Sequence, residues 1–323
     1  MNFVACERQY FDHLKPLYDR LGGSFYVSKQ ISDYAKGLIP ESITYGSISE
    51  LLSLINNFTI ISSYRDLINT RKRGVKQILI EHGCGQTYKG GNSGSYANSV
   101  SGKENVVLYL AVNDHAADSF KRVSDIPCEV IGCPKLDGLV KSKKPSDDTI
   151  AISFHWDCIV APESRSSFYY YKDILPELAE RFNIIGHGHP RIIDEIAPYY
   201  EKAGIEVVRD FKEVCERASV YVADNTSTIF EFAALDRPVV VLNCPLYRKT
   251  VEHGLRFWEC SNVGINCDDP LSLIRTIDIA IKYDEYFKDN RATAVEKVYP
   301  YLQGSVNRAV SIIRSFTNGD YNA

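Results

Sequence analysis

Short apolar runs rich in β-forming residues alternate along this chain with longer segments of helical periodicity, and this alternation limits the fold more than any other feature. The predicted strands cover residues 58–62, 77–81, 106–112, 129–131, 149–154, 182–186, 206–208, 220–223 and 238–242. The predicted helices of the second half cover residues 169–181, 191–203, 211–218, 227–235 and 270–283. Such alternation is typical of βαβ units built around a parallel sheet.

A polar segment, Lys141-Ser-Lys-Lys-Pro-Ser-Asp-Asp148, divides the alternation into two parts. It contains a proline and no hydrophobic periodicity, which indicates an exposed linker. The chain of 323 residues is long enough for two domains of about 150 residues. We therefore predict an α/β protein with Rossmann-like domains at 1–143 and 149–284. A helical segment at 285–323 should pack back on the first domain.

Composition excludes several classes of protein. A net charge of -4 gives no global basic field of the kind that binds nucleic acids or anionic membranes. The nine cysteines are scattered without a CxxC pair, which indicates reduced thiols. Charges appear by residue 7, and no apolar run reaches about 18 residues, so we expect no signal peptide and no transmembrane segment. These features predict a cytoplasmic protein.

The strongest local pattern is the apolar run 220–223 followed by a polar turn, a helix and a second apolar strand that begins after Pro238. The turn consists of Asp224, Asn225, Thr226, Ser227 and Thr228. Backbone N–H groups and hydroxyls at such a turn point toward the carboxyl edge of a parallel sheet, where phosphate groups bind. The same residue types also cap helices, so capping alone is an alternative.

Glu231 lies four residues after Ser227 on the same predicted helical face, where a carboxylate is placed to bind ribose hydroxyls. A solvent-exposed helical glutamate is the alternative. With the turn, Glu231 completes a predicted donor-binding segment.

A second pattern, Ile184-Ile-Gly-His-Gly-His-Pro-Arg191, ends a predicted strand in a glycine-spaced turn. Gly188 lets the backbone approach a ligand, while His189 and Arg191 can donate hydrogen bonds to phosphate oxygens. His187 and His189 resemble metal ligands, but no partner set accompanies them, and we predict no metal site.

A third pattern, Ile78-Leu-Ile-Glu-His-Gly-Cys-Gly-Gln-Thr-Tyr88, places His82 after a strand of the first domain. A histidine there can act as a general base on an acceptor hydroxyl, with Gly83 and Gly85 beside it on the acceptor side. A structural histidine and a nucleophilic Cys84 are the alternatives. The glycine-rich stretch at 89–102 predicts a loop, either mobile at a cleft edge or an ordinary surface loop.

Taken in order, these segments resemble the CDP-glycerol glycerophosphotransferase family, which includes teichoic-acid primases and polymerases with a GT-B fold. The chain has His82-Gly-Cys84 where the family has His-Gly-Thr, and Gly132-Cys-Pro-Lys-Leu-Asp137 where it has a Gly-Tyr-Pro-Arg-Asn-Asp-like turn. The later counterparts are Ser153-Phe-His-Trp156, Gly188-His-Pro-Arg191 and Ala223-Asp-Asn-Thr-Ser-Thr-Ile-Phe-Glu-Phe-Ala233. The resemblance covers residues 78–245.

The resemblance implies a GT-B-like fold in which two Rossmann-like domains face each other across a cleft and a C-terminal helix crosses back. It implies that His82 is the general base, that His189 stabilises the leaving nucleotide or pyrophosphate, and that Asp224 with residues 226–228 lines the diphosphate site. The expected reaction moves a glycosyl or polyol-phosphate group from a nucleotide-diphosphate donor to a hydroxyl acceptor. The donor is a co-substrate, and we expect no other cofactor.

Other functions stay open at this point. The acceptor is a glycan, a polyol phosphate or, if Arg65, residues 71–73 and Lys76 form a basic rim, a hydroxylated base of modified DNA as in some viral glycosyltransferases. A nucleotide-sugar 2-epimerase shares the architecture but needs additional carboxylates for proton abstraction. A non-catalytic nucleotide-sugar-binding protein would keep the donor site and lack a base.

Overall fold

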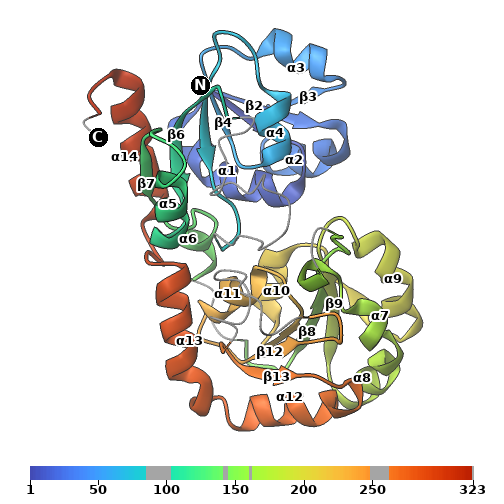
Figure 1. The fold of residues 1–323 in the computed structure, drawn as a ribbon. Helices are drawn as coiled ribbons and strands as arrows, with labels where there is room; N and C mark the ends of the chain where they lie inside the picture. Colours follow the sequence, from blue (N-terminus) through green and yellow to red (C-terminus); the bar gives the residue numbers. More distant parts are fainter. Residues whose placement is uncertain (85–102, 141–144, 160–161, 248–261, 322–323) are drawn as a thin grey trace. The chain divides into compact units, whose positions relative to one another are not determined.

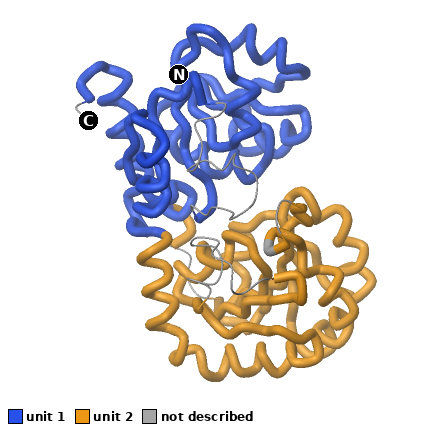
Figure 2. The backbone as a smooth tube through the Cα atoms, in the orientation of Figure 1, with its two compact units in different colours: residues 1–87, 93–137, 299–323 blue, residues 88–92, 138–298 orange. Residues whose placement is uncertain are grey.

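The computed structural model describes residues 1–84, 103–140, 145–159, 162–247 and 262–321, and the chain divides into two compact units. Unit 1 comprises residues 1–87, 93–137 and 299–323, and unit 2 comprises residues 88–92 and 138–298 (Figure 2). Each unit contains one parallel sheet with connecting helices, which confirms the predicted class of two parallel-sheet α/β domains (Figure 1). Gly85, the stretch 89–102 and residues 141–144 of the predicted linker lie outside the described residues.

The sheet of unit 1 has seven strands, and their spatial order reverses direction between β1 and β4. In that order the strands are β3 (Ile43–Tyr45), β2 (Ser24–Ser28), β1 (Asn2–Ala5), β4 (Phe58–Ile61), β5 (Lys76–Ile80), β6 (Val106–Ala111) and β7 (Cys128–Val130). The last four match predicted strands, whereas β1, β2 and β3 were missed. All three missed strands are short, and the helical pattern of the residues between them masks their alternation.

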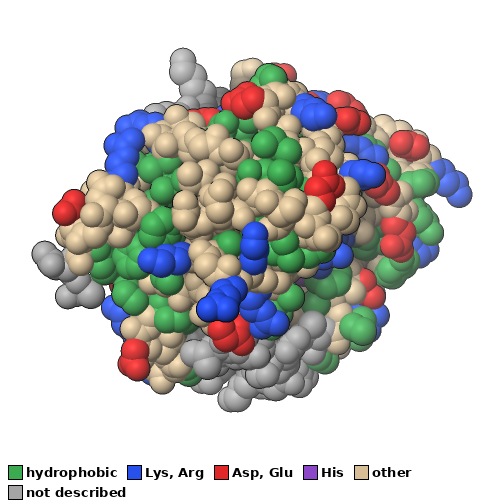
Figure 3. Space-filling model, turned by 90° about the horizontal axis from the view of Figure 1, so that it is seen from above, with side chains coloured by type: hydrophobic (Ala, Val, Ile, Leu, Met, Phe, Trp, Pro, Cys, Tyr) green, Lys and Arg blue, Asp and Glu red, His purple; other side chains and the backbone are tan. Residues whose placement is uncertain are grey.

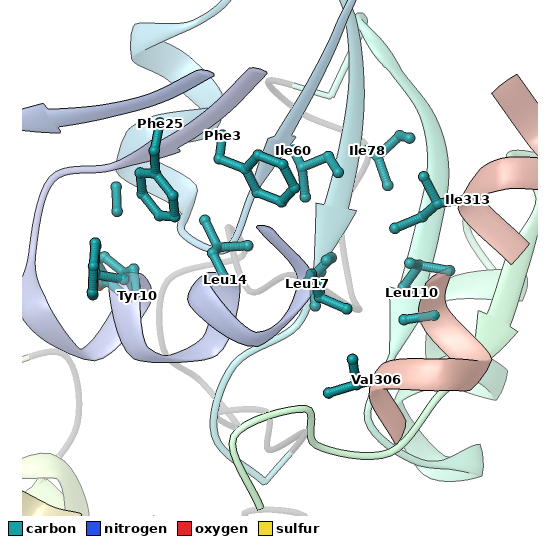
Figure 4. Close-up of a cluster of buried hydrophobic side chains, with 14 of the residues drawn as sticks. Phe3, Tyr10, Leu14, Leu17, Phe25, Ile60, Ile78, Leu110, Val306 and Ile313 are labelled. Carbon is teal, nitrogen blue, oxygen red and sulfur yellow. The ribbon is translucent and has the colours of Figure 1, made fainter. Parts of the chain in front are cut away.

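Helices α1 (Arg8–Leu21) and α14 (Ser305–Asn318) pack against the same face of this sheet, although they lie at opposite ends of the chain. Figure 4 shows Tyr10, Leu14 and Leu17 of α1 and Val306 and Ile313 of α14 beside Phe3, Phe25, Ile60, Ile78 and Leu110 of the strands. Burial of these apolar side chains is the main contribution to the stability of the unit. The other helices of this part of the chain are α2 (Ser32–Leu38), α3 (Ile48–Leu54), α4 (Tyr64–Asn69), α5 (Asp114–Lys121) and α6 (Leu136–Leu139).

The sheet of unit 2 has six described strands and reverses its order between β8 and β11. In spatial order the strands are β10 (Glu206–Val207), β9 (Ile184–Gly188), β8 (Ile150–Phe154), β11 (Val220–Ala223), β12 (Val239–Leu242) and β13 (Ile265–Cys267). The α-helices are α7 (Phe168–Tyr171), α8 (Leu175–Arg181), α9 (Ile193–Lys202), α10 (Phe211–Arg217), α11 (Thr228–Ala233), α12 (Leu273–Lys282) and α13 (Glu285–Val298). Short 3-10 turns are η1 (Lys29–Ile31) in unit 1 and η2 (Pro162–Ser164), η3 (Lys172–Ile174) and η4 (Pro270–Ser272) in unit 2.

The predicted C-terminal helical segment is two helices assigned to different units. In unit 2, the buried Arg291 of α13 bonds to the carboxylates of Asp236 and Asp284. Unit 1 begins again at residue 299, and the first N–H groups of α14, on Ser305 and Val306, donate to the carboxylate of Asp137 at 3.0 and 2.9 Å. These buried and capping contacts, rather than the helical periodicity, decide where the segment divides.

Gly186 in β9 allows a close approach of helix α9. A β-carbon at this position would lie 2.6 Å from ring atoms of Tyr200, a fully buried residue whose hydroxyl donates to the carbonyl of His187 at 2.9 Å. We expect Gly186→Ala to lower the free energy of unfolding by roughly 1–3 kcal/mol, because the ring cannot shift without losing this packing. Urea denaturation measures the change.

The matched control is Gly37→Ala in α2, where a β-carbon meets nothing within 4 Å and the glycine has no positive φ. This variant should be more stable by about 0.5–1 kcal/mol because alanine favours the helix. Equal unfolding midpoints for Gly186→Ala and the unmodified protein would contradict the packing explanation.

Candidate functional site

Strands β8 and β11 end side by side in unit 2, where the order of the sheet reverses. Ser153 is paired with Ala223 at the end of this register. The connections that follow the two strands lead to opposite sides of the sheet, and ligands of open parallel sheets bind at such a switch point. We call the described residues of 155–167, together with 224–228, the switch-point loops.

Asp224 joins the two switch-point loops. Its side chain is fully buried, and its carboxylate accepts from the N–H of His155 at 2.7 Å and from the N–H and hydroxyl of Ser167 at 2.9 and 3.2 Å. Both oxygens therefore bind donors at the two ends of the loop 155–167. The sequence pattern predicts Asp224 as a diphosphate ligand, whereas in the structure its carboxylate holds the two loops together.

The remaining residues of the predicted turn form a small hydrogen-bond network. The amide of Asn225 donates to the carbonyl of Arg165 at 3.2 Å. The hydroxyl of Thr228 lies 3.0 Å from the hydroxyl of Thr226 and 2.7 Å from that of Tyr221. The half-buried Ser227 makes no side-chain capping bond, so its hydroxyl is the one least engaged within the described part of the turn.

Helix α11 begins at Thr228 and covers six residues, which is shorter than the predicted helix at 227–235. A helix of this length has a weak dipole, so the polar groups of the turn contribute more to the predicted phosphate site than the helix end does. Glu231 is 2% exposed and lies inside unit 2. Its predicted contact with a ribose stays a prediction, and the burial of the side chain speaks against it.

His189 follows β9, the neighbour of β8 in the sheet. Its backbone N–H donates to the carbonyl of Phe154 at 2.9 Å, and its Nδ1 accepts from the N–H of Arg191 at 3.1 Å. Because Nδ1 is an acceptor, the proton of the neutral ring is on Nε2. The half-buried ring thus presents an N–H donor at the carboxyl edge of the sheet.

The other residues of the glycine-spaced turn serve packing. A β-carbon on Gly188 would lie 3.0 Å from the side chain of Ile196, so this glycine makes room for α9. His187 is buried, and its Nδ1 lies 2.8 Å from the hydroxyl of Ser153. No group of three or more potential metal-ligating side chains was found among the described residues.

Two aromatic residues at the end of β8 were not predicted as site residues. The guanidinium carbon of the exposed Arg191 lies 4.7 Å from the ring centre of Trp156, a cation–π distance. The ring of His155 lies 5.3 Å from that of His189. Applying the strand-end rule to the predicted strand 149–154 would have found both residues.

His82 of unit 1 follows β5, and its ring packs against helix α1. The centres of the Tyr10 and His82 rings lie 4.7 Å apart with the ring planes nearly perpendicular, and the centre of the His13 ring lies 6.3 Å from that of His82. Burial, together with the charges of Lys135 and His82, holds the pKa of His13 well below its usual range, so His13 is neutral at pH 7. His82 itself is half-buried and lies at the carboxyl edge of its sheet.

Gly83 adopts a φ of 78°, and its carbonyl accepts from the hydroxyl of Tyr299 at 3.4 Å. The backbone turn after His82 requires a glycine at this position because of the positive φ. Cys84 is 1% exposed, which does not fit a nucleophilic thiol.

Asp66 lies at the switch point of unit 1, beyond β4. It is fully buried, and its Oδ2 accepts from the N–H of Cys6 at 3.3 Å and from the hydroxyl of Ser63 at 2.8 Å. Its Oδ1 has no hydrogen-bond partner among the described residues. Burial raises the pKa of Asp66 to about 6, although the bonds from Ser63 and Cys6 oppose this shift.

This shift predicts a pH-dependent stability. The folded pKa of Asp66 is above its ordinary value of 3.8, so the stabilising contribution is complete below pH 3.8 and is lost as the pH rises through about 6. Between pH 4 and pH 7, the unfolding free energy should fall by roughly 2–3 kcal/mol more in the unmodified protein than in Asp66→Asn. Urea denaturation of both proteins across this range is the measurement. Identical pH dependences would show that Asp66 does not titrate in this window.

Arg65 and the other basic residues considered for a DNA-facing rim lie at opposite ends of the sheet of unit 1. Arg65, beyond the carboxyl end of β4, lies 3.5 Å from the carboxylate of Glu7. Residues 71–76 lead into the amino end of β5, and Arg71 is paired with Glu104 at 3.0 Å. Basic and acidic side chains are interspersed on the face shown in Figure 3. These residues therefore do not form the rim that the DNA hypothesis needs.

The two parallel-sheet units define a protein of the GT-B-like class. The wall teichoic acid polymerase TagF is similar, with a TM-score of 0.68 and 12% sequence identity over 100% of this chain and 90% of that chain. The UDP-GlcNAc 2-epimerase from Methanocaldococcus jannaschii is also similar, with a TM-score of 0.58 and 13% identity over 98% of this chain and 99% of that one. At these identities the likeness shows the fold alone.

A family match goes further. Residues 165–313 match the model of the family described as CDP-Glycerol:Poly(glycerophosphate) glycerophosphotransferase. This match confirms the resemblance inferred from the motifs and points to a transferase enzyme. No curated protein sequence matches the chain. Among the described residues, no helix combines the length and the apolar character needed to cross a membrane.

Proposed function

We propose that this protein transfers a polyol-phosphate or glycosyl group from a nucleotide-diphosphate donor to a hydroxyl acceptor. The observation that carries the proposal is the family match over residues 165–313, which includes His189 and the turn 224–228 at the carboxyl edge of one sheet. A glycerol-phosphate group is the first candidate because the matching family is described by that transfer.

Unit 2 binds the donor in this proposal. The Ser227 hydroxyl and the Nε2–H of His189 donate to phosphate oxygens, and the guanidinium of Arg191 adds a positive charge. Such donors stabilise charge that develops on the leaving phosphate. The geometry supports this role because the Arg191 N–H holds Nδ1 of His189 as an acceptor, which leaves the ring proton on Nε2.

Unit 1 supplies the base. His82 accepts the proton of the acceptor hydroxyl, and the oxygen attacks the phosphorus of the transferred group or, for a sugar, its anomeric carbon. A new bond to the acceptor oxygen forms while the bond to the leaving nucleotide oxygen breaks, and the leaving group keeps that electron pair. His189 stabilises the resulting negative charge. The donor is a co-substrate, and the proposal includes no further cofactor.

The alternatives make different demands on the protein. A nucleotide-sugar 2-epimerase needs carboxylates that reach the substrate, whereas Asp66 and Glu81 are 0% and 3% exposed. A nucleotide-sugar-binding protein needs the donor site alone. A glycan or polyol phosphate is the proposed acceptor class, and the cytoplasmic location stays a prediction.

A panel of nucleotide donors, each incubated with and without hydroxyl acceptors, tests the proposal. Acceptor-dependent release of nucleotide supports a transferase. Isomerisation of a nucleotide sugar without release would support the epimerase, and binding without turnover would support the non-catalytic protein.

Ser227→Ala should weaken nucleoside-diphosphate binding by roughly 3–10-fold, since it removes one hydroxyl and leaves the backbone donors in place. Thr228→Ala is a less specific test because it also removes bonds to Tyr221 and Thr226. If Ser227→Ala leaves the affinity unchanged in calorimetry, and the double variant with Thr228→Ala does too, the turn is not the phosphate site.

His82→Gln should lower single-turnover transfer at saturating donor by roughly 10²–10⁴-fold and leave donor affinity nearly intact, because glutamine cannot take up the proton. The two measurements on one variant separate chemistry from binding. His13→Gln is a control for the neighbouring imidazole, which is buried and 6.3 Å away. Transfer at the unmodified rate by His82→Gln would make His82 structural.

A further inference from the structure

Arg165 in the loop after β8 is held in a fixed orientation by one carboxylate. Its Nε and Nη2 donate to the two oxygens of Asp157 at 2.5 and 2.7 Å. Oδ1 of Asp157 also accepts from the N–H of Ser166 at 3.1 Å, so the same carboxylate fixes the guanidinium and the adjacent backbone. The hydrogen bonds from Arg165 hold the pKa of Asp157 below its usual range, which keeps the pair ionised.

The pair leaves one edge of the guanidinium available. Among the described residues, Nη1 of Arg165 has no hydrogen-bond partner, and 39% of the side chain is exposed. An arginine presents its donors in a rigid planar fork that matches phosphate oxygens. Because Asp157 already orients the guanidinium, binding of a phosphate group costs less side-chain conformational entropy.

The backbone of Arg165 is tied to the predicted diphosphate turn. Its carbonyl accepts from the Asn225 amide at 3.2 Å and from the Tyr247 hydroxyl at 2.9 Å. Asp224 holds the ends of the same loop through His155 and Ser167. Arg165 thus lies at the junction of the two switch-point loops, on the same edge of the sheet as His189.

We infer that Arg165 is a further donor-binding residue, whose Nη1 edge binds a phosphate oxygen of the nucleotide diphosphate, and that Asp157 is its positioning residue. The inference rests on the proposed binding of the donor by unit 2. An ordinary surface ion pair is the competing explanation, and removing such a pair would leave ligand affinity unchanged.

Calorimetric titration of cytidine, cytidine monophosphate and cytidine diphosphate, with the uridine series in parallel, tests the inference. Arg165→Ala should weaken diphosphate binding by roughly 10–100-fold and leave nucleoside binding unchanged, because a charge-assisted bond to phosphate is lost. Arg165→Lys should retain part of the affinity, since lysine keeps the charge but not the fork. The diphosphate affinity of Asp157→Asn should lie between those of Arg165→Lys and the unmodified protein.

Arg217→Ala is the matched control. Arg217 is 35% exposed and paired with Glu206 and Glu213, but it ends α10 near the amino edge of the same sheet. Its removal changes net charge equally and should leave nucleotide affinity unchanged. If Arg217→Ala weakens diphosphate binding as much as Arg165→Ala, a general charge effect explains both, and the inference is overturned.

The remaining outcomes distinguish a failure of the proposed function from a failure of the inference about Arg165. If the unmodified protein binds no nucleotide, the proposed function fails and the inference fails with it. If the unmodified protein binds and both Arg165 variants bind equally well, the inference alone fails. If the Arg165 variants lose affinity equally for the nucleoside and for the diphosphate, Arg165 has a structural role and the inference is overturned. If Arg165→Ala does not fold, the diphosphate affinities of the charge-retaining Arg165→Lys and of Asp157→Asn, each compared with that of the unmodified protein, test the inference instead.

Discussion

The buried carboxylate of Asp224 is the interaction on which the arrangement at the edge of unit 2 depends. A charge removed from water is strongly destabilising unless hydrogen bonds replace its hydration. Asp224 receives three such bonds, from His155 and from the N–H and hydroxyl of Ser167, and these donors lie at the two ends of one loop. The requirement to satisfy this charge therefore fixes the loop that carries Trp156, Asp157 and Arg165.

Unit 1 uses the same device at its own switch point. Asp66 follows β4 and accepts from the N–H of Cys6, the residue after β1, just as Asp224 follows β11 and accepts from the residue after β8. In both units a fully buried aspartate binds the end of the first strand at the place where the sheet reverses. The difference lies in how well the charge is satisfied, since one oxygen of Asp66 has no partner among the described residues and its pKa is raised to about 6.

Much of the fold could be predicted because its signals are local. Strands such as 106–111 and 220–223 are apolar runs whose composition is explained by burial in a parallel sheet. The positions of His82, His189 and the turn 224–228 follow from one rule, that polar residues after parallel strands lie at the carboxyl edge. The strands β1, β2 and β3 escaped because the helical pattern of the residues between them masks their alternation, although β1 is a central and completely buried strand.

The sequence by itself determined the α/β class, the two parallel sheets and the family resemblance, because hydrophobic periodicity and strand-end motifs depend on neighbouring residues. Only the tertiary structure decided what individual polar groups do. The polar residues of the turn 224–228 are all candidate phosphate ligands in the sequence, yet contacts with His155 and Ser167 occupy both oxygens of Asp224, whereas Ser227 makes no capping bond. Gly188 was predicted to let the backbone approach a ligand, which stays a prediction, and its missing side chain makes room for Ile196 of α9. Burial and hydrogen bonding are set by partners distant in the sequence, so local patterns can nominate a site residue but cannot assign its contact.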